Sequence, residues 1–330
     1  MAKRSADVVI VGSGIAGCQV AMKLAAQGID VLVLEAGPRD SRAQYIENFR
    51  NAFNKDDFQC PYPPAKHGLH PQYGPDNGYL VQAGEHDYPA GYLRIAGGTT
   101  WHWAGMSWRL TPNDMQMMTK YGVGRDWPIS YDELEPYYYE SEYLMGVGGP
   151  DEGWFAPRSK PYPHKAIELS NYDQTIKAAV GPHGYCMIVE PAARNAAPWR
   201  GRPACAGNNN CMPICPINAQ YTGETAVEDA EIAGATIQEN CVVYRVEHDR
   251  SGKITGVHYK DPNGHSYKVT GQLFVFAATA IETSKLLLIS TSSRYPNGAA
   301  NSIDQVRRTL IDHPGIGLSF LAQEKLWPGR

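Results

Sequence analysis

The chain has 330 residues, of which 43% are hydrophobic, and its formal net charge is −4 at pH 7. This length is enough for two packed domains or one large discontinuous domain. The balanced charge gives no reason to expect nucleic acid as a partner, and no apolar run approaches the roughly 18 residues that span a bilayer. The N-terminus also lacks the apolar core of a signal peptide, so export, if it occurs, must depend on something else.

The first 45 residues have the pattern of a βαβ unit. We expect a buried parallel strand over 7–11, a helix over 18–27 and a second strand over 31–34. The first turn reads G-x-G-x-x-G, with Gly12, Gly14 and Gly17. In dinucleotide folds these glycines permit a tight turn, let the backbone approach the pyrophosphate, and let the helix pack on the strand. The diphosphate then lies at the helix N-terminus, where free N–H groups attract anions.

Glu35 follows the second strand and is placed to accept a hydrogen bond from a ribose hydroxyl. Strand, glycine turn, helix and acid together predict a dinucleotide site, and the alternative is a structural glycine-rich turn. The motif alone does not separate FAD from NAD. The segment Glu35-Ala36-Gly37-Pro38 resembles the flavoprotein form of this strand end.

A second glycine-rich element follows at 97–103. Gly97, Gly98, Thr99 and Thr100 precede Trp101, His102 and Trp103. Glycines and hydroxyls here could let the backbone approach a flavin, whereas the alternative is an aromatic loop of the core. His102 is a candidate flavin neighbour, a candidate covalent attachment point, or a packed histidine with one satisfied hydrogen bond. Farther on, Ser130 and Glu133 fit the capping box of a helix.

Three cysteines, Cys205, Cys211 and Cys215, lie within a loop of Gly, Asn and Pro. Soft thiolates crowded on such a loop suit an iron–sulfur cluster, and a Pro follows the last of them as in ferredoxin-type runs. Three ligands indicate a [3Fe-4S] cluster, or a [4Fe-4S] cluster with one outside ligand. The alternatives are zinc, whose usual sites combine two C-x2-4-C pairs whereas only one is present here, and a disulfide with one free thiol.

The C-terminal third predicts a return to the nucleotide domain. Alternating strands are expected over 235–249 and 258–276, with turns near Gly252 and Gly264, then a buried strand over 273–278 and a helix over 281–289. His313, in the turn 312–315, is a candidate catalytic residue or an ordinary turn residue. The fold class is therefore α/β, with a discontinuous Rossmann-like domain.

The order of these segments resembles the glucose–methanol–choline (GMC) oxidoreductases, and most of all the flavoprotein large subunits of bacterial membrane-bound sugar dehydrogenases. The segments that carry the likeness are VVIVGSGIAG at 8–17, LEAGPR at 34–39, GGTTWHW at 97–103, YGVGRDWPISYDELEPYY at 121–138, CAGNNNCMPICPINA at 205–219, FAATAIETSKLLL at 274–288 and LIDHPGIG at 310–317.

The resemblance implies a GMC/p-cresol-type flavoprotein layout with an inserted, incomplete substrate and cluster domain. The implied parts are a first FAD-binding part at 1–45, FAD-contact loops, cap and part of the substrate domain at 46–200, a cluster loop at 201–220 and a return to the FAD domain at 221–330. FAD would be bound by Gly12, Gly14, Gly17 and Glu35, with Gly97, Gly98 and Thr100 near the isoalloxazine and Val243 at the adenine, whereas His102 stays a candidate cofactor-binding residue from its position in the sequence alone. Cys205, Cys211 and Cys215 match the three ligands of a [3Fe-4S] cluster.

Such enzymes oxidise a sugar or polyol hydroxyl by hydride transfer to the flavin. The resemblance implies that electrons then pass through the cluster to a multihaem cytochrome c subunit. The resemblance also implies a small subunit that carries the twin-arginine export signal, and a periplasmic protein held at the membrane only through its partners.

The sequence also departs from the family pattern. No residue matches the catalytic base, which the family's C-terminal part supplies, so we expect a C-terminally truncated form and leave the catalytic residue unknown. Ala280 and Arg307 replace family glycines, and either change could weaken flavin binding. The competing hypothesis is therefore a non-catalytic remnant that binds the cluster and partner subunits only, and a weaker one is an NAD-linked dehydrogenase.

Overall fold

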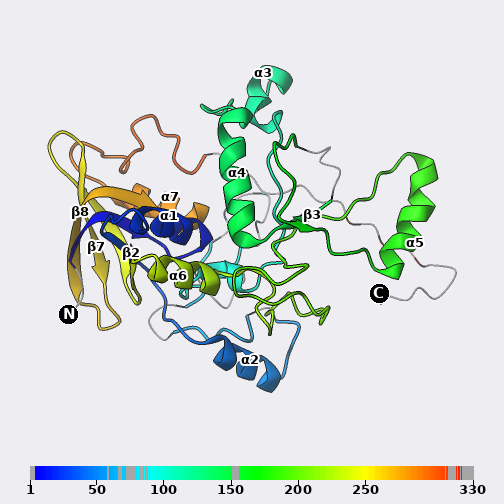
Figure 1. The fold of residues 1–330 in the computed structure, drawn as a ribbon. Helices are drawn as coiled ribbons and strands as arrows, with labels where there is room; N and C mark the ends of the chain where they lie inside the picture. Colours follow the sequence, from blue (N-terminus) through cyan, green and yellow to red (C-terminus); the bar gives the residue numbers. More distant parts are fainter. Residues whose placement is uncertain are drawn as a thin grey trace. The chain divides into compact units, whose positions relative to one another are not determined.

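The computed structural model describes residues 4–57, 59–65, 69–71, 79–81, 83, 85, 88, 90–150, 156–308, 310, 317, 319 and 321. The chain divides into two compact units, each built from separate segments (Figure 1). The first unit comprises Met1–Trp103, Asn209–Pro216 and Thr222–Leu310, and the second comprises Ala104–Asn208, Ile217–Tyr221 and Ile311–Arg330. The turn at 311–316, with His313, lies outside the described residues.

The first unit is built on a six-stranded sheet in the order β5-β2-β1-β8-β7-β6. Its strands are β1 (Ser5–Val11), β2 (Val31–Leu34), β5 (Thr236–Gln238), β6 (Val242–His248), β7 (Ile254–Lys260) and β8 (Ser266–Phe276). The pairs β1–β2, β1–β8 and β2–β5 are parallel, whereas β6–β7 and β7–β8 are antiparallel. Its helices are α1 (Ile15–Ala25), α2 (Arg42–Asn51), α6 (Gly223–Ile232) and α7 (Thr279–Ile289), with a 3-10 turn, η1, at Gly98–Trp101.

The N-terminal βαβ prediction is confirmed. Both predicted strands form, and β2 has the predicted bounds. The helix begins three residues earlier than expected, at Ile15, because Gly14 itself caps it in an extended conformation. All four residues of β2 are buried, as expected for an inner strand of a parallel sheet.

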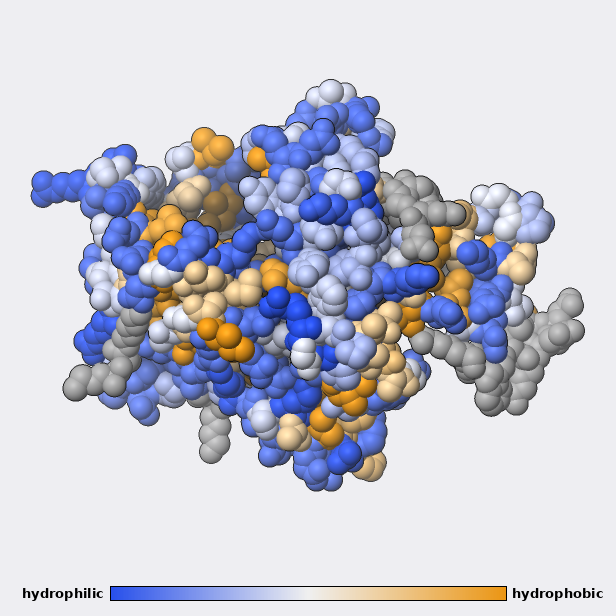
Figure 2. Space-filling model, in the orientation of Figure 1, coloured by the Kyte–Doolittle hydropathy of each residue, from blue (hydrophilic) through white to orange (hydrophobic). Residues whose placement is uncertain are grey.

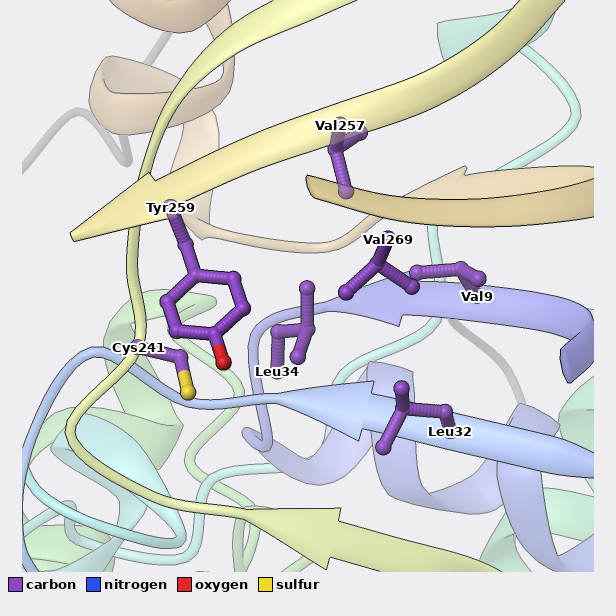
Figure 3. Packing of buried hydrophobic residues seen from close by; sticks show 7 residues of the cluster. All are labelled: Val9, Leu32, Leu34, Cys241, Val257, Tyr259 and Val269. Carbon is purple, nitrogen blue, oxygen red and sulfur yellow. The ribbon is translucent and has the colours of Figure 1, made fainter. Parts of the chain in front are cut away.

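β8 joins the two parts of the sheet. Thr270 pairs with Gly256 of β7 and also with Ser5 of β1, so this long strand leaves the antiparallel meander and enters the parallel sheet. Gly271 lies at this crossing, where a side chain would approach Cγ2 of Val9 to 2.9 Å. Side chains of β7 and β8 pack on those of β1 and β2 in one core, which also includes Cys241 from the segment before β6. Its members are Val9, Leu32, Leu34, Cys241, Val257, Tyr259 and Val269 (Figure 3). Burial of each aliphatic side chain contributes roughly 1.5–3 kcal/mol.

The C-terminal strands differ from expectation in two ways. The predicted strand 235–249 is two strands, because β5 joins the parallel sheet whereas β6 belongs to the meander. Leu273, predicted to be buried, is 55% exposed. Beyond Thr270, β8 has a hydrogen-bonded strand neighbour on one side only among the described residues, which explains this exposure. The turns at Gly252 and Gly264 are confirmed, since each donates its N–H three residues back.

The second unit holds α3 (Met117–Tyr121), α4 (Tyr131–Met145), α5 (Asn171–Val180), the 3-10 turns η2 (Asp114–Gln116) and η3 (Gly181–His183), and the short pair β3 (Gly148–Gly149) and β4 (His164–Lys165). The predicted capping box starts α4, with Ser130 and Glu133 bonded reciprocally. Arg109 is buried between Glu135 and Glu142, which removes the cost of an unpaired buried charge.

No helix among the described residues is long and apolar enough to cross a membrane. On the face drawn in Figure 2, hydrophobic residues form separate patches among hydrophilic ones.

Candidate flavin site

The turn after β1 requires glycine at two of its three motif positions. Gly12 has φ +102°, and a Cβ there would lie 2.5 Å from the carbonyl oxygen of Ala277. A Cβ on Gly17 would lie 2.1 Å from the carbonyl oxygen of Gly12. The steric roles read from the motif, a tight turn and close packing of helix on strand, agree with this geometry.

Gly14 differs from both, because its backbone faces open space. Nothing lies within 4 Å of the position that a Cβ would take, and the residue caps the N-terminus of α1. The first N–H groups of a helix have no partner within the helix, and its dipole favours an anion there. An anionic group can therefore approach the backbone at Gly14 closely.

The second glycine-rich element lies directly against this turn. The N–H of Gly97 donates to Oγ of Ser13 at 3.0 Å, and a Cβ on Gly98 would lie 3.7 Å from Cα of Gly14. Gly97 has φ +90°, and its own Cβ would lie 2.6 Å from the carbonyl carbon of Gly223. Two segments more than 80 residues apart thus form one backbone-lined surface beside the N-terminus of α1.

The aromatic residues after these glycines have different surroundings. Trp101 is buried among Tyr45, Tyr62 and others, and its indole N–H donates to Ala96 at 2.8 Å, as the packing interpretation requires. Thr100 donates to the carbonyl of Gly97 at 3.0 Å. Nε2 of His102 is buried without a hydrogen-bond partner among the described residues. Burial lowers the pKa of His102, so the ring is neutral near pH 7.

Glu35 is buried, and its carboxylate links the turn at Ser13 to the segment at Gly37. One carboxylate oxygen accepts from the N–H of Ser13 at 3.0 Å and from its hydroxyl at 2.6 Å, and the other accepts from Gly37 at 2.8 Å. Burial raises the pKa of Glu35, and these hydrogen bonds oppose the rise. A carboxylate offers about four acceptor positions. The predicted ribose contact therefore has a position available and stays a prediction.

Val243 lies on β6 opposite Tyr259 and packs against the buried clusters around Val9 and around Val11. This is a packing environment, and the predicted adenine contact stays a prediction.

The three cysteines are divided between the two units of the chain. Cys205 belongs to the second unit, whereas Cys211 and Cys215 belong to the first. Among the described residues, no group of three or more His, Cys, Asp or Glu side chains is gathered closely enough to hold a metal ion. None of the seven cysteines is in a disulfide, so the disulfide alternative is also not formed. The geometry thus does not support the predicted cluster, and we derive no reaction step from it.

Sequence reasoning missed several residues that assemble this region. Ser13 links Glu35 to Gly97, and Gly223 allows the close approach of Gly97. The position of Ser13 between two motif glycines could have indicated its role. Arg42 and Tyr62 contact the cysteine loop but carry no motif that would have indicated this.

Three observations indicate that the residues of this site fit a flavin dinucleotide. The backbone at Gly14 is open, the N-terminus of α1 supplies unpaired N–H groups, and Nε2 of His102 is a buried polar atom without a partner among the described residues.

Comparisons with known proteins agree with this geometry. Residues 7–46 match the family model described as FAD dependent oxidoreductase. The fructose dehydrogenase large subunit of Gluconobacter japonicus is 48% identical over 98% of this chain and 61% of its own length. A GMC-type oxidoreductase of Mycobacterium tuberculosis is 29% identical over 98% of this chain and 44% of its own length.

Solved structures agree on the fold. The formate oxidase of Aspergillus oryzae superposes with a TM-score of 0.51 at 17% identity, covering 88% of this chain and 48% of that one. The chain thus spans between two fifths and two thirds of the length of these relatives. The chain is thus similar in sequence to a fructose dehydrogenase large subunit and to a GMC-type oxidoreductase, and similar in fold to a formate oxidase.

Proposed function

We propose that the chain holds FAD in a dehydrogenase that oxidises a hydroxyl group of a sugar or polyol. The main observation that supports this proposal is the surface formed by Gly14 and Gly98. Two backbone turns meet there beside the N-terminus of α1 without a side chain between them. The similarity to a fructose dehydrogenase subunit supports a sugar or polyol as the substrate.

FAD, when bound, supplies an acceptor for the hydride that leaves the substrate carbon. The residues of this chain bind and orient it. The first N–H groups of α1 neutralise the diphosphate, Gly14 leaves room for it, and Nε2 of His102 offers one hydrogen bond. Oxidation of a hydroxyl also needs a general base, and the catalytic residue stays unknown among the described residues.

A second part of the proposal concerns the path by which electrons leave the flavin. We propose that Cys205, Cys211 and Cys215 ligate a [3Fe-4S] cluster in the functional protein, and that a multihaem cytochrome c subunit takes the electrons. A small subunit with the export signal and a periplasmic, membrane-associated location through these partners belong to the same proposal. Its support is the spacing of the three thiols and the family resemblance. Iron and acid-labile sulfide in natively purified protein, lost on Cys211→Ser, test the cluster.

A specific observation favours a second candidate, a non-catalytic relative. Arg307, where the family has glycine, has φ +77°, and Thr279 beside the flavin turn has φ +64°. Such conformations cost roughly 1–2 kcal/mol for residues other than Gly or Asn. Strain at Thr279, next to the turn at Gly12, is what relaxed selection on flavin binding would leave behind.

The visible absorption spectrum decides between the two candidates. A flavin band near ~450 nm that bleaches on anaerobic addition of fructose, glucose or sorbitol establishes the dehydrogenase and identifies its substrate. A flavin band that responds to none of them, or no flavin at all, establishes the non-catalytic relative. Tightly bound NAD in place of flavin would overturn both.

A further inference from the structure

The second unit contains a cavity of about 540 Å³. It is lined by Gly149, Pro150 and residues 158–165, which all belong to this unit, so it shares no residue with the candidate flavin site. Small-molecule sites in proteins have volumes of roughly 300–1,000 Å³. The cavity is therefore large enough for a ligand the size of a phosphorylated sugar.

The segment that lines this cavity is anchored at its start by two acids of α4. Arg158 donates from Nη1 and Nη2 to the carboxylate of Glu142, at 2.9 and 2.5 Å. The hydroxyl of Ser159 donates to Glu135 at 2.7 Å. Arg109 forms ion pairs with both acids, so their charges are balanced by the two arginines. The charge of Arg158 is therefore not available to a ligand.

The end of the same segment is fixed by backbone geometry. Lys165 lies opposite Gly149 in the pair of β3 and β4. A Cβ on Gly149 would lie 2.4 Å from the ring of Tyr162, so glycine is what lets this ring lie against the backbone. Pro161 and Pro163 restrict the chain further, because proline fixes φ. A cavity shaped in advance loses less conformational entropy when a ligand binds.

The positive charge inside the cavity has no counter-charge. Lys160, His164 and Lys165 line it, whereas no Asp or Glu among the described residues does. Neither lysine forms an ion pair within the described part of the chain, and Nζ of Lys160 lies 4.6 Å from the ring centroid of Tyr139 instead. Nε2 of His164 is buried and has no hydrogen-bond partner among the described residues, which is unusual for a buried polar atom. Two uncompensated ammonium groups in one cavity favour an anionic ligand.

We propose that this cavity binds a phosphate group through Lys160 and Lys165, either as free phosphate or as the phosphate of a small sugar ester. The lysine ammonium is a compact point charge that suits phosphate. A phosphate ester carries nearly two negative charges at pH 7, which two lysines can balance, whereas a carboxylate carries one. The site depends neither on the flavin nor on the three cysteines, so the proposed function and this proposal stand or fall separately.

Isothermal titration calorimetry on the purified holoprotein tests the proposal. Inorganic phosphate, fructose 6-phosphate and gluconate are titrated separately, in a phosphate-free buffer at constant ionic strength. The cavity variant combines Lys160→Gln with Lys165→Gln. The control variant combines Lys120→Gln with Lys177→Gln, which changes the net charge equally at exposed positions of the same unit outside the cavity lining. Melting curves check that both variants are folded.

We expect wild type to bind one equivalent of a phosphate compound, and gluconate to bind roughly fivefold more weakly or less. The cavity variant should lose roughly tenfold or more in phosphate affinity, because two charge-assisted contacts are removed. The control variant should stay within about twofold of wild type. Tighter binding of fructose 6-phosphate than of inorganic phosphate identifies a sugar phosphate as the ligand, and equal binding identifies free phosphate.

Three outcomes overturn the proposal. Wild type that binds neither phosphate compound has no such site. An unchanged affinity in the cavity variant, or equal weakening in both variants, shows that phosphate binds elsewhere or by general attraction to positive charge. Gluconate that binds as tightly as phosphate overturns the assignment of a phosphate group. Lys165→Gln alone, at an exposed position, should weaken binding roughly threefold and keeps the test decisive if the double variant unfolds.

Discussion

The flavin turns and the cysteine loop are equally conspicuous in the sequence, but they differ in how the described residues hold them. The turns around Gly12 and Gly97 are fixed by the protein itself, through steric contacts that only glycine permits and through Ser13 and Glu35. The three cysteines lie in two different units and no metal-binding group is gathered among the described residues. A site that depends on backbone shape forms without its ligand, whereas a cluster site needs metal–thiolate bonds to draw its ligands together.

This contrast has a direct consequence for Gly14. Gly14→Val should reduce the flavin content of purified protein by roughly a hundredfold, because the new side chain fills the space for the pyrophosphate. The thermal unfolding midpoint of the flavin-free protein should stay close to wild type, since nothing lies within 4 Å of the added Cβ. The flavin-to-protein absorbance ratio and a melting curve measure the two effects. A variant with full flavin content would refute the assignment of Gly14.

Alanine substitutions at Gly97 and Gly207 distinguish the cost of an unfavourable backbone conformation from the cost of steric overlap with neighbouring atoms. Gly97→Ala should cost about 3 kcal/mol or more in the free energy of unfolding, because the Cβ would lie 2.6 Å from the carbonyl carbon of Gly223 at φ +90°. Gly207→Ala, at φ +71° in the cysteine loop with nothing within 4 Å, should cost only about 1 kcal/mol. Urea denaturation measures both. Similar costs would mean that the close approach of Gly97 to Gly223 adds nothing to the cost of its backbone conformation.

The sequence predicted what depends on local pattern. The βαβ unit, the hairpin turns and the capping box of α4 follow from apolar runs, glycine turns and capping residues, and all are confirmed. It did not predict that β8 serves two sheet regions, because that depends on pairing between strands far apart in the chain. It found the glycines of both turns but missed Tyr62 and Arg42, whose roles come from tertiary contacts alone.

His70 makes the scaffold of the flavin turn sensitive to acid. Its Nε2 is bonded to the carbonyl of Tyr62 at 2.8 Å and its Nδ1 accepts from the N–H of Arg94 at 3.0 Å, an arrangement that only the neutral ring can satisfy. Burial, and then the charge of Arg94, lower the pKa of His70 below its ordinary value near 6.5. The unfolded chain therefore binds more protons in this range, so the stabilisation is complete above about pH 6.5 and is lost as the pH falls.

Urea denaturation at pH 7.5 and at pH 5.5 measures the loss. His70→Gln keeps one donor and one acceptor but does not titrate, so its free energy of unfolding should fall less between these two values than that of wild type. An unchanged pH dependence would show that His70 contributes nothing to it.

Thr279 should give the smallest effect. It has φ +64° at the start of α7, directly after Ala278, whose Cα approaches the turn at Gly12. A β-branched residue is strained in this conformation, whereas asparagine tolerates it. Thr279→Asn should therefore stabilise the flavin-free protein by about 0.5–1 kcal/mol in urea denaturation. Thr283→Asn, inside the helix, is the control and should not stabilise. A destabilised Thr279→Asn would mean that the contact of the Thr279 hydroxyl with the N–H of Glu282 outweighs the backbone strain. In that case the strained turn is maintained by its own side chain, and the argument for a degenerate flavin site loses this support.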